Sequence, residues 1–199
     1  YGEFNQDKIS NLKLIPNDDE KFAKHLGILI DDKLSFKHHF NNLHSRLNRA
    51  IYSLRQMKHI LDQEHLKLLY NAYCKSILEY GAILFTGVNA STLKIIILLQ
   101  NRAIRIITNS HYLASAAPLF RRLRLLPMDR IIDYYACKHM FDYKFGLLPE
   151  AFNGQWILAH EIHGRFLRNE NDFFINRANT NFIKNLPLNS LPARWNSLP

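Results

Sequence analysis

The sequence predicts a mainly helical protein, in which a short β-hairpin precedes a helical bundle and an irregular C-terminal tail follows it. Three observations support this fold class. Through residues 36–145, apolar side chains recur every three or four positions, which is the spacing of one face of a helix. Before them, the short apolar segment 23–30 is closed by the turn signal Asp31-Asp32-Lys33. After Gly146, Asn, Pro and isolated aromatic residues dominate, and the helical spacing weakens.

The first elements follow from short apolar runs and turn signals. Residues 8–15 are consistent with a strand or a loop, and residues 23–30 predict a strand. A helix is expected at 36–59, because its apolar residues share one face while the basic ones project elsewhere. The residues of this face are Phe36, Phe40, Leu43, Leu47, Ile51, Leu54 and Met57.

Four further helices are predicted from their end signals. Asp62 can accept a hydrogen bond from the first turn of the second helix, and Ser91 from that of the third. Pro127 suits the first position of the last long helix, and Gly146 ends that helix. The expected ranges are 63–84, 91–108, 114–123 and 127–145.

The positive charge is concentrated in the helical middle of the chain. The 199 residues carry a formal net charge of +9. Residues 36–145 hold 16 Lys and Arg against 6 Asp and Glu, whereas residues 1–35 hold 5 against 7 and residues 146–199 hold 5 against 4. A localised positive field of this size suits a polyanion as partner. The other reading, the solvated surface of a basic protein, stays open.

Composition argues against several other classes. No apolar run approaches the ~20 residues of a membrane span and no signal segment opens the chain, so we expect no membrane partner and an intracellular location, in the nucleus or cytoplasm. Cys74 and Cys137 lie within apolar helical patterns, as reduced, buried cysteines do. His160 and His163 are three residues apart, whereas the helical zinc motif needs four, so we expect no metal or cofactor in this chain. Because the first residue is Tyr1, we expect the chain to begin inside a longer reading frame or after processing.

The Asp31-Asp32 pair looks superficially like the metal-binding turn of polymerases. Two-metal phosphoryl transfer needs carboxylates from separate segments that converge on ions ~4 Å apart. The partner carboxylate would have to lie upstream of the 30 residues that precede this pair. We therefore expect a turn in which an Asp has a structural role, and no catalytic residue in this chain.

Two groups of residues carry a resemblance to a known family. The first is Leu26-Gly27-Ile28, followed by Asp31, Leu34-Ser35-Phe36 and His39. The second is Tyr70, Tyr80-Gly81 and Gln100-Asn101-Arg102-Ala103-Ile104-Arg105. Their order and spacing resemble the region that follows the catalytic palm in reverse transcriptases of non-LTR retrotransposons, of the LINE or jockey kind. The closing Trp195-Asn196-Ser197-Leu198-Pro199 resembles an element that ends many such polyproteins.

The resemblance implies three parts and one kind of partner. Residues 1–34 would be the end of the palm with its primer-grip-like β element, 35–145 a thumb-like helical domain, and 146–199 a weakly structured C-terminal extension. In the family, the hairpin positions the 3′ end of the growing strand, and the first thumb helix lies along the template–primer duplex. The implied partner is an RNA–DNA hybrid or other nucleic acid, held through Lys24, His25, Gly27, Lys37, Arg46, Arg49, Arg102 and Arg105.

The resemblance covers the part that holds nucleic acid and not the part that does chemistry. The parent activity it implies is RNA-directed DNA synthesis with Mg²⁺ and deoxynucleotides, which needs the palm domain of the same polyprotein as a second partner. Alone, the chain is expected to be inactive as a polymerase.

Alternatives to this reading stay open. The chain could be a non-enzymatic helical module that binds a protein through apolar helices, or a decayed transposon remnant that folds poorly. Gln100 and Asn101 could instead pin helices together by side-chain hydrogen bonds, and Trp195 could either dock on the helices or stack on a base.

Overall fold

The computed structural model describes residues 14–15, 22–163 and 172–198, and this part of the chain is mainly helical, as the sequence predicts. An antiparallel sheet lies at its N-terminal end and has the strand order β1-β2-β3. The strands are β1 (Leu14–Ile15), β2 (Phe22–His25) and β3 (Ile28–Asp31). The predicted strand 23–30 is therefore a hairpin, because a turn at residues 26–27 divides it into β2 and β3.

Most of the remaining described residues form helices. The longest are α1 (Lys37–Met57), α4 (Ala90–Ile107) and α6 (Met128–Lys144). The shorter ones are α2 (Gln63–Tyr70), α3 (Ser76–Glu79), α5 (Ala116–Leu123), α7 (Ala159–His163), α8 (Asn181–Asn185) and α9 (Pro187–Asn196).

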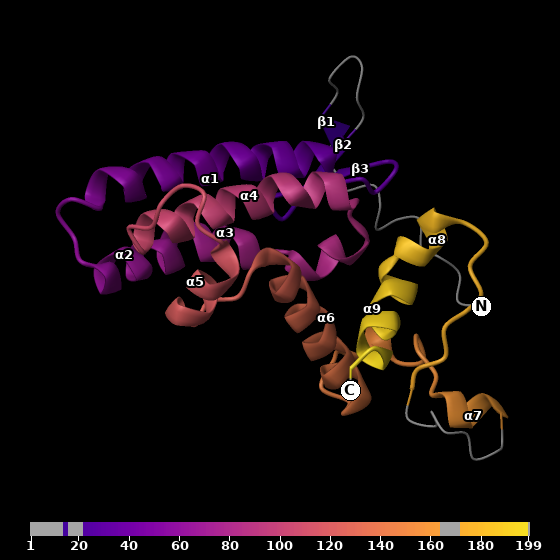
Figure 1. Cartoon of the computed structure of the whole chain (residues 1–199). Helices are drawn as coiled ribbons and strands as arrows, with labels where there is room; N and C mark the ends of the chain where they lie inside the picture. Colours follow the sequence, from indigo (N-terminus) through magenta and orange to yellow (C-terminus); the bar gives the residue numbers. More distant parts are fainter. Residues whose placement is uncertain (1–13, 16–21, 164–171, 199) are drawn as a thin grey trace.

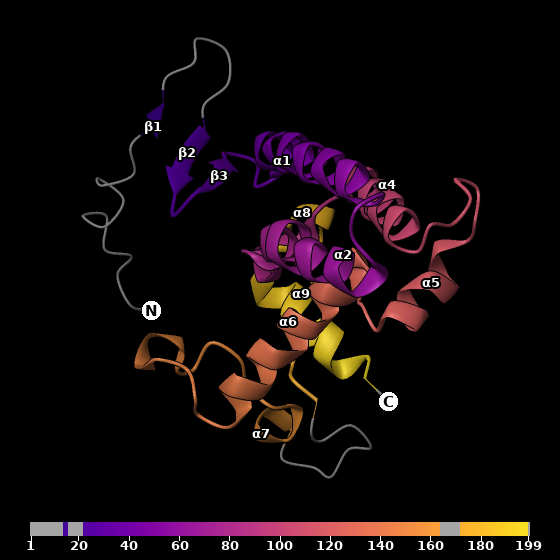
Figure 2. The same cartoon turned by 90° about the vertical axis from the view of Figure 1, so that its left-hand side faces the viewer.

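Helices α1 and α4 lie side by side in both views and form the centre of the fold (Figures 1 and 2). The predicted apolar face of α1 is buried from Phe40 to Leu54, whereas Met57, at its end, is 40% exposed. The face packs against the buried apolar side chains of α4, which are Ile96, Leu99, Ala103, Ile104 and Ile107. Burying one such aliphatic side chain stabilises a fold by about 1.5–3 kcal/mol, so this packing is a main source of the stability of the bundle.

The helix predicted at 63–84 is interrupted twice. Asp62 caps α2 as expected, since its carboxylate accepts the N–H of His65. A π-helical turn at Asn71–Lys75 separates α2 from α3, and Gly81, with φ of +72°, ends the helical run before a 3₁₀ turn at Ala82–Gly87. The expected cap at Ser91 is wrong, because α4 already begins at Ala90.

The hairpin is held against the helical body by the residues at this interruption. The Tyr80 hydroxyl donates a hydrogen bond to the carbonyl of Leu26 in the hairpin turn. A Cβ atom at position 81 would lie 2.7 Å from Cδ1 of Ile28, and Gly81 has a φ of +72°, which residues with a side chain rarely adopt, so both features favour glycine here. The Leu-Gly-Ile and Tyr-Gly sequences, far apart along the chain, thus meet in the structure.

Gln100 joins three parts of the bundle through a buried hydrogen-bond network. Its Nε2 donates to the Tyr70 hydroxyl at 2.8 Å and to the carbonyl of Leu126 at 3.0 Å. Its Oε1 accepts the N–H of Met128, at the start of α6, at 2.8 Å. One side chain therefore links α2, α4 and α6, which confirms the structural alternative for Gln100.

The C-terminal residues include two helices that the sequence does not predict. Between 146 and 180 the described residues form only short turns, α7 and an isolated bridge between Leu158 and Phe173, as expected of an irregular segment. Helices α8 and α9 then follow, and α9 packs on α6 in both views (Figures 1 and 2). Pro187 starts α9 and Pro192 lies inside it, so its sequence resembles a loop.

Side chains of α9 fasten it to the rest of the molecule. Arg194 forms an ion pair with Asp133 of α6 and donates to the carbonyl of Thr86 at 3.1 Å. The Asn196 amide exchanges two hydrogen bonds with the backbone of Phe173, at 3.0 and 2.8 Å. Trp195 packs on an apolar cluster formed by the buried residues Ala136, Met140, Trp156, Phe173 and Leu191. Of the two alternatives for this residue, the structure therefore favours docking.

We expect replacement of Gln100 by Ala to lower the free energy of unfolding by about 3 kcal/mol, because it leaves the buried N–H of Met128 and the Tyr70 hydroxyl without this partner. Urea unfolding followed by circular dichroism measures the change. Asn101→Ala is the matched control: its half-buried side chain forms no hydrogen bond within the described residues, and it should change stability by less than about 1 kcal/mol. Equal losses of stability in the two variants would contradict the role assigned to Gln100.

Candidate nucleic-acid interface

The Asp31 carboxylate is used within its own turn. Its Oδ1 accepts the N–H groups of Lys33 at 3.1 Å and Ser35 at 2.8 Å, and its Oδ2 accepts the Ser35 hydroxyl at 3.0 Å. Burial acts to raise the pKa of Asp31, but these hydrogen bonds outweigh it and hold the pKa below its ordinary value. The carboxylate thus fixes the entry into α1, which supports the interpretation as a structural turn. Among the described residues, no three His, Cys, Asp or Glu side chains lie where they could hold a metal ion together.

The predicted site residues near the N-terminus lie on the hairpin and at the start of α1. Lys24 and His25 end β2, Gly27 lies in the turn with φ of +82°, and all three are exposed. Lys37 is the first residue of α1 and is also exposed.

The hairpin rests on a buried histidine of α1. His39 is 2% exposed, and its Nδ1 accepts the N–H of Leu29 in β3 at 3.4 Å. Its ring lies 5.3 Å from that of Phe85, and no hydrogen-bond partner for its Nε2 is found among the described residues. Burial lowers the pKa of His39, and the nearby Arg46 charge lowers it further. The neutral ring therefore holds the edge of β3 against α1.

A groove of about 500 Å³ runs between α1 and the α2–α3 segment. Arg46 and Arg49 line its α1 wall, and Tyr73, which is 60% exposed, lines the opposite wall. Its remaining lining is mostly apolar. We call this the α1–α2 groove; it combines two cations with an exposed aromatic ring.

A second concavity, of about 570 Å³, lies at the C-terminal ends of α1 and α4, and we call it the basic pocket. Four cations line it: Arg55 and Lys58 from α1 and its end, and Arg102 and Arg105 from α4. The other lining residues are His59, Ile106, Asn109, Ser110 and Tyr112. None of these is acidic, and within the described part of the chain none of the four cations forms an ion pair.

The cations of the basic pocket exceed what the two helix ends require. The C-terminal end of a helix carries roughly half a negative charge, which basic side chains in the last turn offset. Two helix ends therefore offset about one positive charge, whereas four cations line the pocket. The excess makes this concavity suitable for an anionic ligand.

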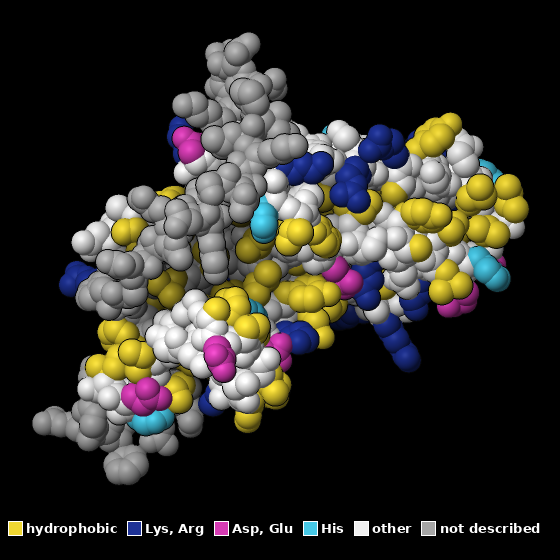
Figure 3. Space-filling model, turned by 180° about the vertical axis from the view of Figure 1, so that it is seen from behind, with side chains coloured by type: hydrophobic (Ala, Val, Ile, Leu, Met, Phe, Trp, Pro, Cys, Tyr) yellow, Lys and Arg dark blue, Asp and Glu magenta, His cyan; other side chains and the backbone are white. Residues whose placement is uncertain are grey.

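The structure separates the predicted residues into four places, of which the start of α1 carries Lys37 alone. Lys24, His25 and Gly27 lie on the hairpin, Arg46 and Arg49 on the α1–α2 groove, and Arg102 and Arg105 on the basic pocket. On the face that Figure 3 shows, Lys and Arg side chains lie at several separate places rather than in one patch.

Sequence reasoning did not assign a site role to Arg55, Lys58 or Tyr112. The first two lie at the end of the predicted helix 36–59, where basic residues are ordinary. Only the packing of α1 on α4 places them beside Arg102 and Arg105.

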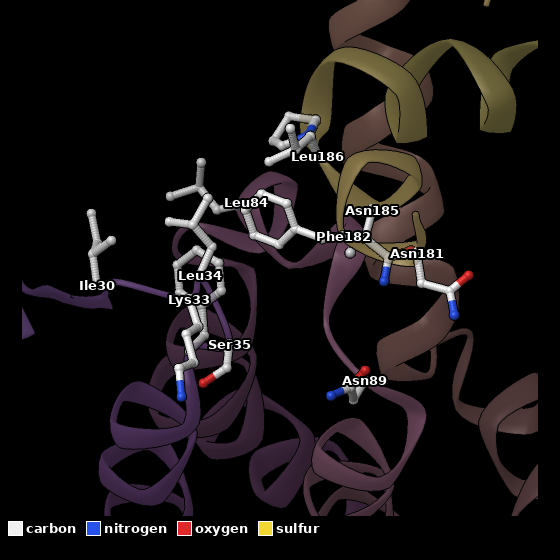
Figure 4. Close-up of a pocket in the computed structure, with 13 residues that line it drawn as sticks. Ile30, Lys33, Leu34, Ser35, Leu84, Asn89, Asn181, Phe182, Asn185 and Leu186 are labelled. Carbon is white, nitrogen blue, oxygen red and sulfur yellow. The ribbon is translucent and has the colours of Figure 1, made fainter. Parts of the chain in front are cut away.

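A third cavity, of about 540 Å³, lies at the other end of the two long helices. Ile30 and Leu34 lie on one side, and Phe182 and Leu186 of the α8–α9 segment lie on the other (Figure 4). Phe36 also lines the cavity. Leu34 and Phe36 have φ angles of +50° and +55°, and residues other than glycine rarely adopt this left-handed backbone conformation. This cavity is mostly apolar and is called the apolar cavity below.

No family model, curated protein or solved structure matches this chain in comparisons with known proteins. Among the helices that the structure describes, none has the length and apolar character needed to cross a membrane.

We expect the free energy of unfolding to fall as the pH drops below about 6.5. The folded-state pKa of His39 is lowered, so the unfolded chain binds this proton more readily, and stability decreases between the unfolded and the folded pKa. His39→Gln retains an acceptor without titrating and should reduce the slope of stability against pH, measured by urea unfolding from about pH 7.5 to about pH 5.5.

Part of the slope should remain in this variant, since burial also lowers the pKa of His139. An unchanged slope in His39→Gln would contradict the assignment to His39.

Proposed function

We propose that this chain is a nucleic-acid-holding module that binds an RNA–DNA hybrid through its phosphates, as the end of the palm and the thumb do in the non-LTR reverse transcriptases it resembles. The observation that carries the proposal is the basic pocket. Its four cations are not paired with carboxylates among the described residues, and they lie in a concave surface between two rigid helices. Arg46 and Arg49, in the α1–α2 groove, provide additional positive charge on α1.

The expected mode of binding follows the shape and backbone of the duplex. An RNA-containing duplex has a wide, shallow minor groove, which proteins follow through sugar and phosphate contacts with little reading of bases. Arginine guanidinium groups suit this role because they form paired hydrogen bonds with phosphate oxygens. The hairpin residues Lys24, His25 and Gly27 would contact the strand end, since the exposed turn leaves the backbone at Gly27 accessible.

Catalysis is assigned to another part of the parent protein. In this proposal Mg²⁺ and the reacting carboxylates belong to an upstream palm domain, and this chain contributes position and affinity. The proposal also implies an intracellular location, in the nucleus or the cytoplasm.

The apolar cavity supports a second candidate function, a protein-interaction module. Its lining includes Leu34, Phe36, Leu84 and Phe182 (Figure 4), which could receive an apolar side chain of a partner. Binding of this kind depends weakly on salt, whereas phosphate binding depends on it strongly.

The test is the salt dependence of binding to a blunt RNA–DNA hybrid, measured by fluorescence anisotropy. We expect the logarithm of the association constant to fall linearly with the logarithm of the salt concentration between about 50 mM and about 200 mM. The double variant Arg55→Gln/Arg102→Gln should weaken binding and reduce the magnitude of the slope by about two, because each variant residue leaves one phosphate without its neutralising cation.

A charge-matched control separates local effects from net charge. Lys94 lies near the start of α4 and Lys184 lies in α8, and both are exposed. Lys94→Gln/Lys184→Gln should leave the slope near the wild-type value. Equal effects of the two double variants, or binding that does not respond to salt, would contradict the proposal.

A further inference from the structure

The basic pocket has an exposed aromatic ring on its rim. Tyr112 lines the pocket and is 72% exposed. Its ring centroid lies 4.5 Å from that of His111, so the two rings form a small aromatic surface beside the cations. Exposed aromatic residues next to a cationic groove are the components of single-strand binding sites, because any base can stack on them.

The loop that carries Tyr112 is held in place by hydrogen bonds. Arg105 Nε donates to the carbonyl of Ala114 at 2.8 Å, and the N–H of Ser110 donates to the carbonyl of Arg105 at 3.0 Å. The hydroxyls of Thr108 and Ser110 lie 2.8 Å apart, within hydrogen-bond distance. The exposed ring is thus presented by an ordered loop, so little further entropy is lost in ordering the loop when a ligand binds.

Stacking on Tyr112 requires a base with a free face. Inside a duplex both faces of a base are covered by its neighbours, so an exposed tyrosine can stack only on a terminal or unpaired base. Phosphate binding alone would not require the ring. The combination of Tyr112 with the cations of the pocket therefore favours an unpaired nucleotide over an internal base pair.

We propose that the basic pocket binds the end of a duplex, with the last duplex phosphates among Arg55, Lys58 and Arg102 and the first unpaired base beyond that end stacked on Tyr112. This inference rests on the proposed function and names the ligand of the same pocket. Because every base has a stacking face, the site accepts unpaired nucleotides without strong sequence preference.

The experiment compares two hybrids that differ only in a short single-stranded overhang. For the wild-type chain, the overhang should raise the affinity about tenfold, the size of one stacked base. Tyr112→Ala should remove this increase and leave binding of the blunt hybrid unchanged, whereas Tyr112→Phe, which keeps the ring, should retain it. Tyr134, exposed on α6 and outside the pocket, provides the control, and Tyr134→Ala should behave as wild type.

The outcomes separate this inference from the proposed function. Equal wild-type affinity for the two hybrids would overturn the inference and leave the proposed function standing. An overhang effect that persists in Tyr112→Ala would also overturn it. A wild-type chain that binds neither hybrid would overturn both. Because Tyr112 is exposed, its variants should unfold at the wild-type urea concentration, and this measurement confirms that a missing overhang effect does not come from unfolding.

Discussion

The packing of α1 on α4 is the interaction on which the rest of the structure depends. The two helices run in the same direction, since Phe36 and Asn89 near their starts line the apolar cavity, while Arg55 and Arg105 near their ends line the basic pocket. Their apolar faces are almost fully buried against each other. This one arrangement places the hairpin and the apolar cavity at one end of the bundle and the four cations of the basic pocket at the other.

The sequence predicts those parts of the fold that depend on local spacing. The apolar face of α1 and the cap at Asp62 are visible because each is set by residues within one or two helical turns. The π-helical turn at Asn71–Lys75 is not visible in the sequence, because a π turn leaves the apolar spacing nearly intact. Helix α9 is not visible either, because Pro192 lies inside it. Both depend on tertiary packing, which overrides local preference.

The candidate site was predictable only in part, for the same reason. Arg102 and Arg105 lie within one turn of the same helix, so the sequence places them together. Their neighbours Arg55 and Lys58 are about 50 residues away along the chain, and Tyr112 is on a loop with no regular pattern. The grouping of these residues is a property of the packed fold. The docking of the hairpin on Tyr80 and Gly81 could not be predicted from the sequence either, because neither residue carries a local signal for its partner.

The parallel arrangement of α1 and α4 also explains why cations gather where they do. Two parallel helices bring two partly negative ends together, which is unfavourable unless positive charge lies nearby. Basic residues at these ends therefore stabilise the fold, but four of them leave an excess of like charge in one concave surface. Like charges that are not paired repel one another and reduce stability. An anionic ligand relieves that repulsion, so the feature that costs the free chain some stability is also the feature on which the proposed binding of phosphate rests.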